Sequence, residues 1–172
     1  MTVLSPMRTE AFAPYFDAAI VGYAEDNVLS GRWPADGAIE RSRADFQSSL
    51  PRGLETPDNH LFEIKAGEGG PSVGVLWFVI QVRDGLRSAH VCDLEVKAEF
   101  RRQGHAMRAL RALEPIVTAL GLSTIGLHVF GHNLGARALY AKLGYGVTGI
   151  NMMKNIGETR ASRDRLPGNV SD

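Results

Sequence analysis

Residues 99–110 read EFRRQGHAMRAL and lie between an apolar segment typical of a strand and an apolar segment typical of a helix. The first amides of a helix have no internal partners and lie at the positive end of its dipole, where they can bind an anion. Gly104 lets the backbone approach a ligand closely, and Arg101 and Arg102 can pair with phosphate oxygens. The stretch therefore fits a pyrophosphate-binding turn and, equally well when taken alone, a charged surface turn before an ordinary helix.

The segments before this turn show helical spacing first and strand-like patterns afterwards. The expected order in this part of the chain is one strand, two helices and three strands. The expected elements are a strand at 3–8, a helix opened by Pro14 and ending near Leu29, a helix that buries Ile39, Phe46 and Leu50, and strands at 60–66, 73–82 and 88–96.

The segments after the turn continue the alternation of helix and strand. We expect a helix from about Gly104, a strand at 124–130, a helix at 133–143 and a last strand at 145–154. This order predicts an α/β (α+β) sandwich, in which helices cover a mixed, mostly antiparallel sheet.

Length and composition fit one soluble domain, because the chain has 172 residues of which 44% are hydrophobic. The 19 basic and 19 acidic residues cancel, which disfavours nucleic acid as a partner. The longest apolar run, residues 73–80, is too short to span a membrane, and no signal peptide is recognisable, so we expect a cytoplasmic protein. The single Cys92 excludes a disulfide within the chain, is expected to be a small buried side chain, and has no metal-ligand spacing around it.

A second motif lies at 133–145, NLGARALYAKLGY. Asn133 and Tyr140 are seven residues apart, which places them on one helix face about 10 Å from each other. Asn133 suits the N-cap of that helix and Gly144 suits its end. A capped helix with a packed tyrosine explains this motif when it is taken alone.

Together the two motifs resemble the GNAT superfamily of acyl-CoA-dependent N-acetyltransferases. The pyrophosphate turn of that family, Arg/Gln-x-x-Gly-x-Gly/Ala, is matched by Arg101, Gly104 and Ala106. Its later signature is matched by Asn133, Ala136, Leu139, Tyr140, Gly144 and Tyr145. The resemblance covers about residues 61–154, whereas the first sixty residues carry no family signature.

The resemblance implies a GNAT-like fold with a central sheet of about six to seven strands flanked by about four helices. It implies one domain at 1–156, in which residues 1–60 shape the acceptor site and residues 61–156 bind acetyl-CoA. The remaining residues, 157–172, are typical of a solvated, disordered tail.

The resemblance also implies a set of residues that bind acetyl-CoA. The strand before the turn would pair its backbone with the pantetheine arm, and the amides of the turn would hold the pyrophosphate. The residues implied in these contacts are Leu94, Val96, Arg101, Arg102, Gln103, Gly104, His105, Ala106, Met107, Asn133, Ala136 and Tyr140.

Aminolysis of a thioester requires a neutral amine and benefits from a proton on the leaving sulfur. The resemblance places Tyr140 near that sulfur, and a phenol with a pKa near 10 can donate to a thiolate. Glu95 is our first candidate for the base and Asp93 the second, because both point to the same strand face. For Glu95, an ion pair with a basic residue is an equally good explanation.

The acceptor is expected to lie near Tyr23, Trp33 and His128, although core packing explains the two aromatic residues and a structural role explains the histidine. The resemblance implies transfer of an acetyl group from acetyl-CoA to a primary amine of a small molecule, by direct attack within a ternary complex. Acetylation of protein N-termini or lysines, and a non-catalytic CoA-binding sensor, are the alternatives. We expect no metal, no nucleic acid and no membrane partner, and a homodimer is an assembly common in the family.

Overall fold

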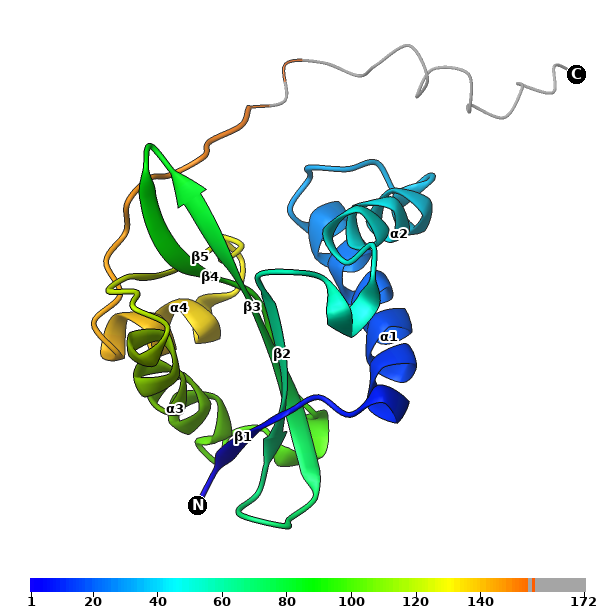
Figure 1. The fold of residues 1–172 in the computed structure, drawn as a ribbon. Coiled ribbons are helices and arrows are strands. Elements are labelled where there is room, and N and C mark those ends of the chain that lie inside the picture. The colour runs from blue at the N-terminus through cyan, green and yellow to red at the C-terminus, as the bar shows by residue number, and fades with distance from the viewer. Residues whose placement is uncertain (155, 157–172) are drawn as a thin grey trace, which may run out of the picture.

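A computed structural model describes residues 1–154 and residue 156, so the expected tail at 157–172 lies outside the described residues. Helices and strands alternate much as the sequence predicts (Figure 1). The elements are β1 Val3–Pro6, α1 Thr9–Leu29, α2 Ala38–Ser49, β2 Asn59–Lys65, β3 Ser72–Arg83, β4 Leu86–Val96, α3 His105–Ala119, β5 Ile125–Leu127 and α4 Leu134–Lys142, with single 3₁₀ turns at Gly53–Glu55 and Ala98–Phe100.

Within the described residues the strands form one five-stranded sheet in the order β1-β2-β3-β4-β5. The first four strands are antiparallel neighbours, and β5 pairs parallel to β4 after the crossover through α3. Figure 1 shows α1 and α2 on one side of the sheet and α3 and α4 on the other. The predicted fold class, a mixed and mostly antiparallel sheet flanked by helices, is confirmed.

Alternating side chains of the central strand β3 supply both faces of the sheet with apolar contacts. Leu76 and Phe78 belong to a buried cluster that α3 completes with Leu113. Trp77 belongs to a second cluster, which α1 completes with Ile20. The sheet therefore has a core on each side, one packed against α3 and the other against α1 and α2.

The register between β3 and β4 shifts at one point in the middle of the sheet. Trp77 faces Asp93 and Phe78 faces Val91, so Cys92 has no partner residue on β3. This is the geometry of a β-bulge, in which the extra residue is left out of the ladder. Cys92 is consequently exposed, and the prediction that it is a buried apolar residue is wrong.

Two predicted boundaries and one predicted strand also differ from the structure. α1 begins at Thr9, so Pro14 lies inside the helix rather than at its start. The strand expected at 124–130 is reduced to Ile125–Leu127, and residues 145–154 form no strand. A strand needs a neighbour to take its backbone hydrogen bonds, and the short β5 pairs only with β4 among the described residues.

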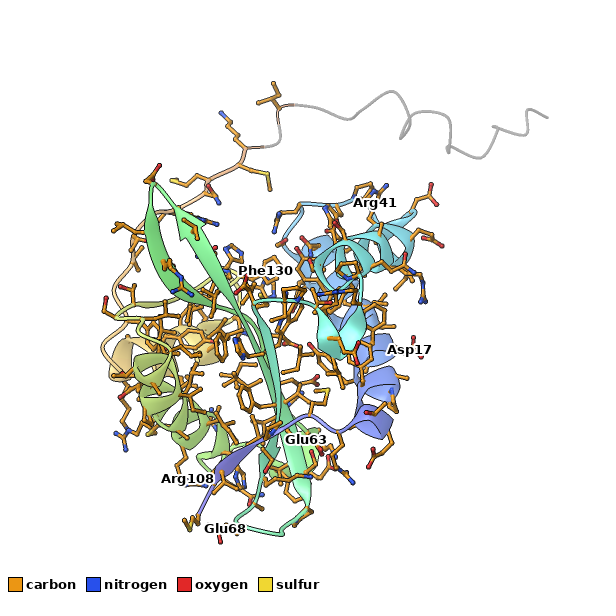
Figure 2. The ribbon with its side chains drawn as sticks, in the orientation of Figure 1. Asp17, Arg41, Glu63, Glu68, Arg108 and Phe130 are labelled. Atoms are coloured by element: carbon orange, nitrogen blue, oxygen red, sulfur yellow. The ribbon has the colours of Figure 1, made fainter. Side chains whose placement is uncertain are left out.

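A buried carboxylate at one end of the sheet links β2 to Arg8, which lies between β1 and α1. Glu63 on β2 accepts from Arg8 Nε at 2.9 Å and from Lys65 Nζ at 2.8 Å, and only 2% of its surface is exposed. Figure 2 shows Glu63 beside β1. Burial alone would raise the pKa of Glu63, but the hydrogen bonds from Arg8 and Lys65 outweigh it and lower the pKa to about 2.

We predict that Glu63 stabilises the fold in a pH-dependent way. Its folded pKa lies below the unfolded value, so its contribution is present above about pH 5 and is lost as the pH falls toward 2. Glu63→Gln should lower the free energy of unfolding by about 2 kcal/mol near neutral pH and by much less at about pH 3. Urea unfolding at both pH values measures the difference.

The matched control is Glu10→Gln. The Glu10 carboxylate pairs with the same Arg8 at 2.8 Å but is 68% exposed, so its loss should cost less than about 0.5 kcal/mol. Equal losses in the two variants would show that burial of Glu63 adds nothing to the pair.

Candidate active site

The sheet opens where β4 and β5 separate. The two strands pair only from Ala89 with Ile125 to Val91 with Leu127, whereas β4 continues beside β3 as far as Val96. The outer edge of β4 at residues 93–96 has no strand beside it within the described residues. An extended ligand can therefore pair with the backbone there, close to Leu94 and Val96.

The start of α3 lies beyond the end of this open edge. Gly104 is the N-cap with φ of +80°, and Arg102 also has a positive φ, of +63°. Within the described residues no side chain caps the helix, so the first amides, at His105, Ala106 and Met107, keep their donors for a ligand. The residues expected from the sequence thus form an uncapped helix start.

Arg108, one turn into α3, folds back over this helix start (Figure 2). Its Nη2 donates to the Gln103 carbonyl at 2.7 Å, and its Nε donates to Thr2 Oγ1 at 2.8 Å. Thr2 also lies 3.0 Å from His105 Nδ1, which ties the N-terminus of the chain to the turn. Arg108 therefore holds the turn in shape and adds positive charge beside it, a role that the sequence motif does not reveal.

Arg101 points back toward the end of β4. Its Nε donates to the Val96 carbonyl at 2.8 Å, and its Nη2 lies 3.7 Å from Glu95 Oε1. Both side chains are more than half exposed. The geometry matches the ion-pair interpretation of Glu95 that the sequence left open.

Asp93 lies on the sheet face toward α1, opposite Trp77. The Tyr15 hydroxyl of α1 donates to Asp93 Oδ2 at 3.0 Å. Burial raises the pKa of Asp93 to about 6, the Tyr15 hydrogen bond opposes the rise, and the charges of Glu95 and Asp26 add to it. Asp93 therefore ionises near neutral pH, which is the range a general base needs.

Tyr140 is half-buried on α4, and its ring packs against Tyr145 with centroids 5.6 Å apart. Burial and then the charge of Asp93 raise the pKa of Tyr140, so the phenol is protonated at neutral pH and lies close enough to Asp93 to feel its charge. Asn133 Oδ1 accepts from the Ala136 amide at 3.1 Å, which confirms the predicted N-cap.

The residues expected at the acceptor end are connected through aromatic contacts. The Tyr23 ring lies 5.4 Å from Trp33 and 6.5 Å from Phe130. The His128 ring lies 5.2 Å from Phe130, which Figure 2 labels between the sheet and the α1–α2 layer. The loop after α1 and the segment after β5 therefore meet at Tyr23 of α1.

Sequence reasoning missed two side-chain contacts of this region. One is the Tyr15–Asp93 hydrogen bond, and the other is the approach of His132 Nε2 to Asp26 Oδ1 at 3.2 Å, which joins α1 to the segment before α4. In the sequence, the only indication that Tyr15 makes such a contact is its hydroxyl group on the apolar face of α1. The contact partners are 78 and 106 residues away in the chain, so local patterns could not have paired them.

The described residues contain neither a metal-binding cluster of side chains nor a helix that could cross a membrane. No group of three or more histidine, cysteine, aspartate or glutamate side chains there is arranged to hold a metal ion. None of the helices there combines the length and the apolar character needed to cross a membrane.

Comparison with known proteins identifies the family. The family model described as acetyltransferase (GNAT) family matches residues 16–145. The chain is 37% identical over 157 residues to YycN of Bacillus subtilis (strain 168), named an uncharacterized N-acetyltransferase, and covers all of that protein with 91% of its own length. It is 31% identical over 153 residues to YdgE of the same organism, which bears the same description, with 89% of this chain and 97% of YdgE covered.

The fold agrees with a solved relative as well. The crystal structure of Bacillus subtilis YycN superposes with a TM-score of 0.86 at 36% identity, and the match covers 92% of this chain and 100% of YycN. GNAT enzymes generally use acetyl-CoA and act on an acceptor substrate. The chain therefore belongs to the GNAT family of acetyltransferases and is an acyltransferase.

Proposed function

We propose that the protein is an N-acetyltransferase that moves the acetyl group of acetyl-CoA to the primary amine of a small molecule, by direct attack within a ternary complex. The observation that carries this proposal is the position of Asp93. This carboxyl, with a pKa near 6, lies within the electrostatic reach of the Tyr140 phenol, at the open edge of β4.

The residues around this opening fit acetyl-CoA. The outer backbone edge of β4 at Leu94 and Val96 suits an extended pantetheine arm, which would displace Arg101 from the Val96 carbonyl. The uncapped amides at 102–107 suit the pyrophosphate. Asn133 and Ala136 at the start of α4 would hold the pantetheine from the other side. When bound, acetyl-CoA supplies an acetyl group already activated as a thioester.

Asp93 acts as the base in this proposal. Its raised pKa leaves it ionised at neutral pH yet makes it a stronger base than an ordinary carboxylate with a pKa near 4. It takes the proton of the acceptor amine, directly or through a water molecule. Glu95, our first candidate from the sequence, is half exposed and paired with Arg101, so we rank Asp93 above it.

Tyr140 acts as the acid in this proposal. Its raised pKa keeps the phenolic proton in place at neutral pH, and the hydroxyl can donate that proton to the departing sulfur. α4 presents Tyr140 in the same helix as the Asn133 cap, so one element would hold both the cofactor arm and the proton donor.

The acceptor end is lined by aromatic rings and acidic groups. Tyr23, Trp33, Phe130 and His128 supply the rings, and Asp26 lies near enough to raise the pKa of Asp93. Ring faces and carboxylates both attract a protonated amine. This composition supports a cationic small molecule as the acceptor.

We predict that Gly104→Asp weakens acetyl-CoA binding. A carboxylate at the helix start would repel the pyrophosphate, and the positive φ strains any residue with a Cβ. Saturating CoA should raise the melting temperature of the wild type, with about 2.7 kcal/mol of stabilisation at about 100 times the dissociation constant. In Gly104→Asp this shift should be lost.

Gly85→Asp is the matched control, because Gly85 has a φ of +78° in the open turn between β3 and β4. It introduces the same charge at a similar positive φ away from the proposed pyrophosphate site, although a Cβ at Gly104 also comes within 2.8 Å of Arg108 Nη1 and one at Gly85 meets nothing within 4 Å. A CoA-induced shift that persists in Gly104→Asp would place the pyrophosphate elsewhere.

Asp93→Asn should lower kcat by about 100-fold, because a general base typically contributes 10²–10⁴. Only the ionised form of Asp93 accepts a proton, so wild-type kcat/KM should fall as the pH drops through about 6, and this limb should disappear in the variant. Thiol release across pH measures both effects. Glu95→Gln should keep the fall of kcat/KM near pH 6. If this fall disappears in Glu95→Gln and persists in Asp93→Asn, Glu95 rather than Asp93 is the base.

Tyr140→Phe should lower kcat by about 100-fold and leave the KM for acetyl-CoA nearly unchanged, because it removes only the hydroxyl. Thiol release at saturating acceptor measures this. Tyr145→Phe is the control on the neighbouring ring and should retain turnover. Full activity of Tyr140→Phe at every pH would rule out the proposed acid.

A further inference from the structure

Three side chains that can carry positive charge lie near the end of the β3–β4 hairpin, outside the proposed catalytic pair. They are Arg83, His90 and His128, and we call them the hairpin cluster. β2 pairs with β3 only as far as Val79, and β5 pairs with β4 only from Ala89, so the hairpin extends beyond both neighbouring strands. Figure 1 shows the end of the hairpin at the same end of the molecule as α2.

Strand register places the first two members of the cluster on the sheet face that carries Asp93. Side chains alternate along β3, so Arg83 and Val79 lie on the same face as Trp77, which packs against α1. Asp93 pairs with Trp77 and His90 pairs with Val79, so both of these β4 side chains also point to this face. The carboxyl and the imidazole are therefore neighbours along one strand.

Gly126 of β5 brings the second histidine to the same face. It pairs with His90, and a Cβ at this glycine would lie 3.8 Å from His90 Nδ1, so the position leaves space beside the ring. His128 follows two residues later, and its ring contacts Phe130 with centroids 5.2 Å apart. The hairpin cluster is therefore continuous with the aromatic residues at the acceptor end.

The hairpin cluster has hydrogen-bond donors to offer an anion. Burial lowers the pKa of His90, and the charges of Arg83 and His128 lower it further, as expected for groups within electrostatic reach of one another. None of the three side chains forms an ion pair with another described residue. A guanidinium donates five hydrogen bonds, and an imidazole keeps at least one N–H donor whether it is neutral or protonated.

We propose that the acceptor carries a carboxylate at the end opposite its reacting amine, and that Arg83, His90 and His128 bind this carboxylate. The inference rests on the proposed function, in which Asp93 receives the proton of that amine. His90 and Asp93 are three residues apart on β4, which is about 10 Å along a strand. Several methylene groups must therefore separate the amine from the carboxylate, as in an ω-amino acid, and the ring of Phe130 suits contact with them.

Thiol release with a matched pair of acceptors tests the inference. The acceptors 6-aminohexanoate and 6-aminohexanamide have the same length and the same reacting amine, and they differ in the charge at the far end. In the wild type, kcat/KM for the carboxylate should exceed kcat/KM for the amide by about 10-fold, mainly through KM, because charge-assisted hydrogen bonds are the stronger ones. Arg83→Gln combined with His90→Gln should abolish this preference.

Arg87→Gln is the matched control. Arg87 belongs to the same hairpin but pairs with Val82, so its side chain lies on the opposite face of the sheet. This variant should keep the preference for the carboxylate. Equal kcat/KM for the two acceptors in the wild type overturns the inference, and so does a preference that survives the double variant or is lost in Arg87→Gln.

Calorimetry on the full chain saturated with CoA separates this inference from the proposed function. Binding of 6-aminohexanoate that is weakened in the double variant, without turnover of any amine, would contradict the proposed function and support the carboxylate site. Turnover of both acceptors with equal binding of the two would do the reverse. Arg83→Gln alone changes an exposed side chain, so it should fold normally and still weaken binding of the carboxylate.

Discussion

The separation of β4 from β5 is the constraint on which the rest of the site depends. β4 is held along its whole length by antiparallel pairing with β3, whereas parallel pairing with β5 ends after Val91. The bulge at Cys92 lies where the two strands part, and bulges bend and twist the strand that carries them. Asp93 follows immediately, so the carboxyl is placed by the same irregularity that opens the β4 edge.

The apolar clusters on the two faces of the sheet position the functional groups around this opening. The cluster around α3 fixes the helix whose uncapped start supplies positive potential near this opening. The cluster around α1 includes Tyr15, only 7% exposed, which brings its hydroxyl to Asp93. Packing of α1 therefore both buries the carboxyl and partly satisfies it, and these opposing effects leave its pKa near 6.

Local sequence patterns predicted those features that depend on neighbouring residues. The order of helices and strands, the Asn133 cap and the conformation of Gly104 follow from spacing and residue type. The exposure of Cys92 was not predictable, because one extra residue in β4 changes which side chains of the strand point to each face of the sheet. The different surroundings of Asp93 and Glu95 were not predictable either, because Asp93 is bonded to Tyr15 of α1 and Glu95 is paired with Arg101. Neither contact follows from the strand itself.

Residues 145–154 have a sequence typical of a strand, yet they form no strand in the structure. A strand-like sequence states only that a segment would bury well beside another strand, and it does not say which chain supplies that neighbour. Residues 145–154 meet the first condition, and the single chain does not meet the second. Sequence patterns can therefore indicate an element without indicating the neighbour that it needs.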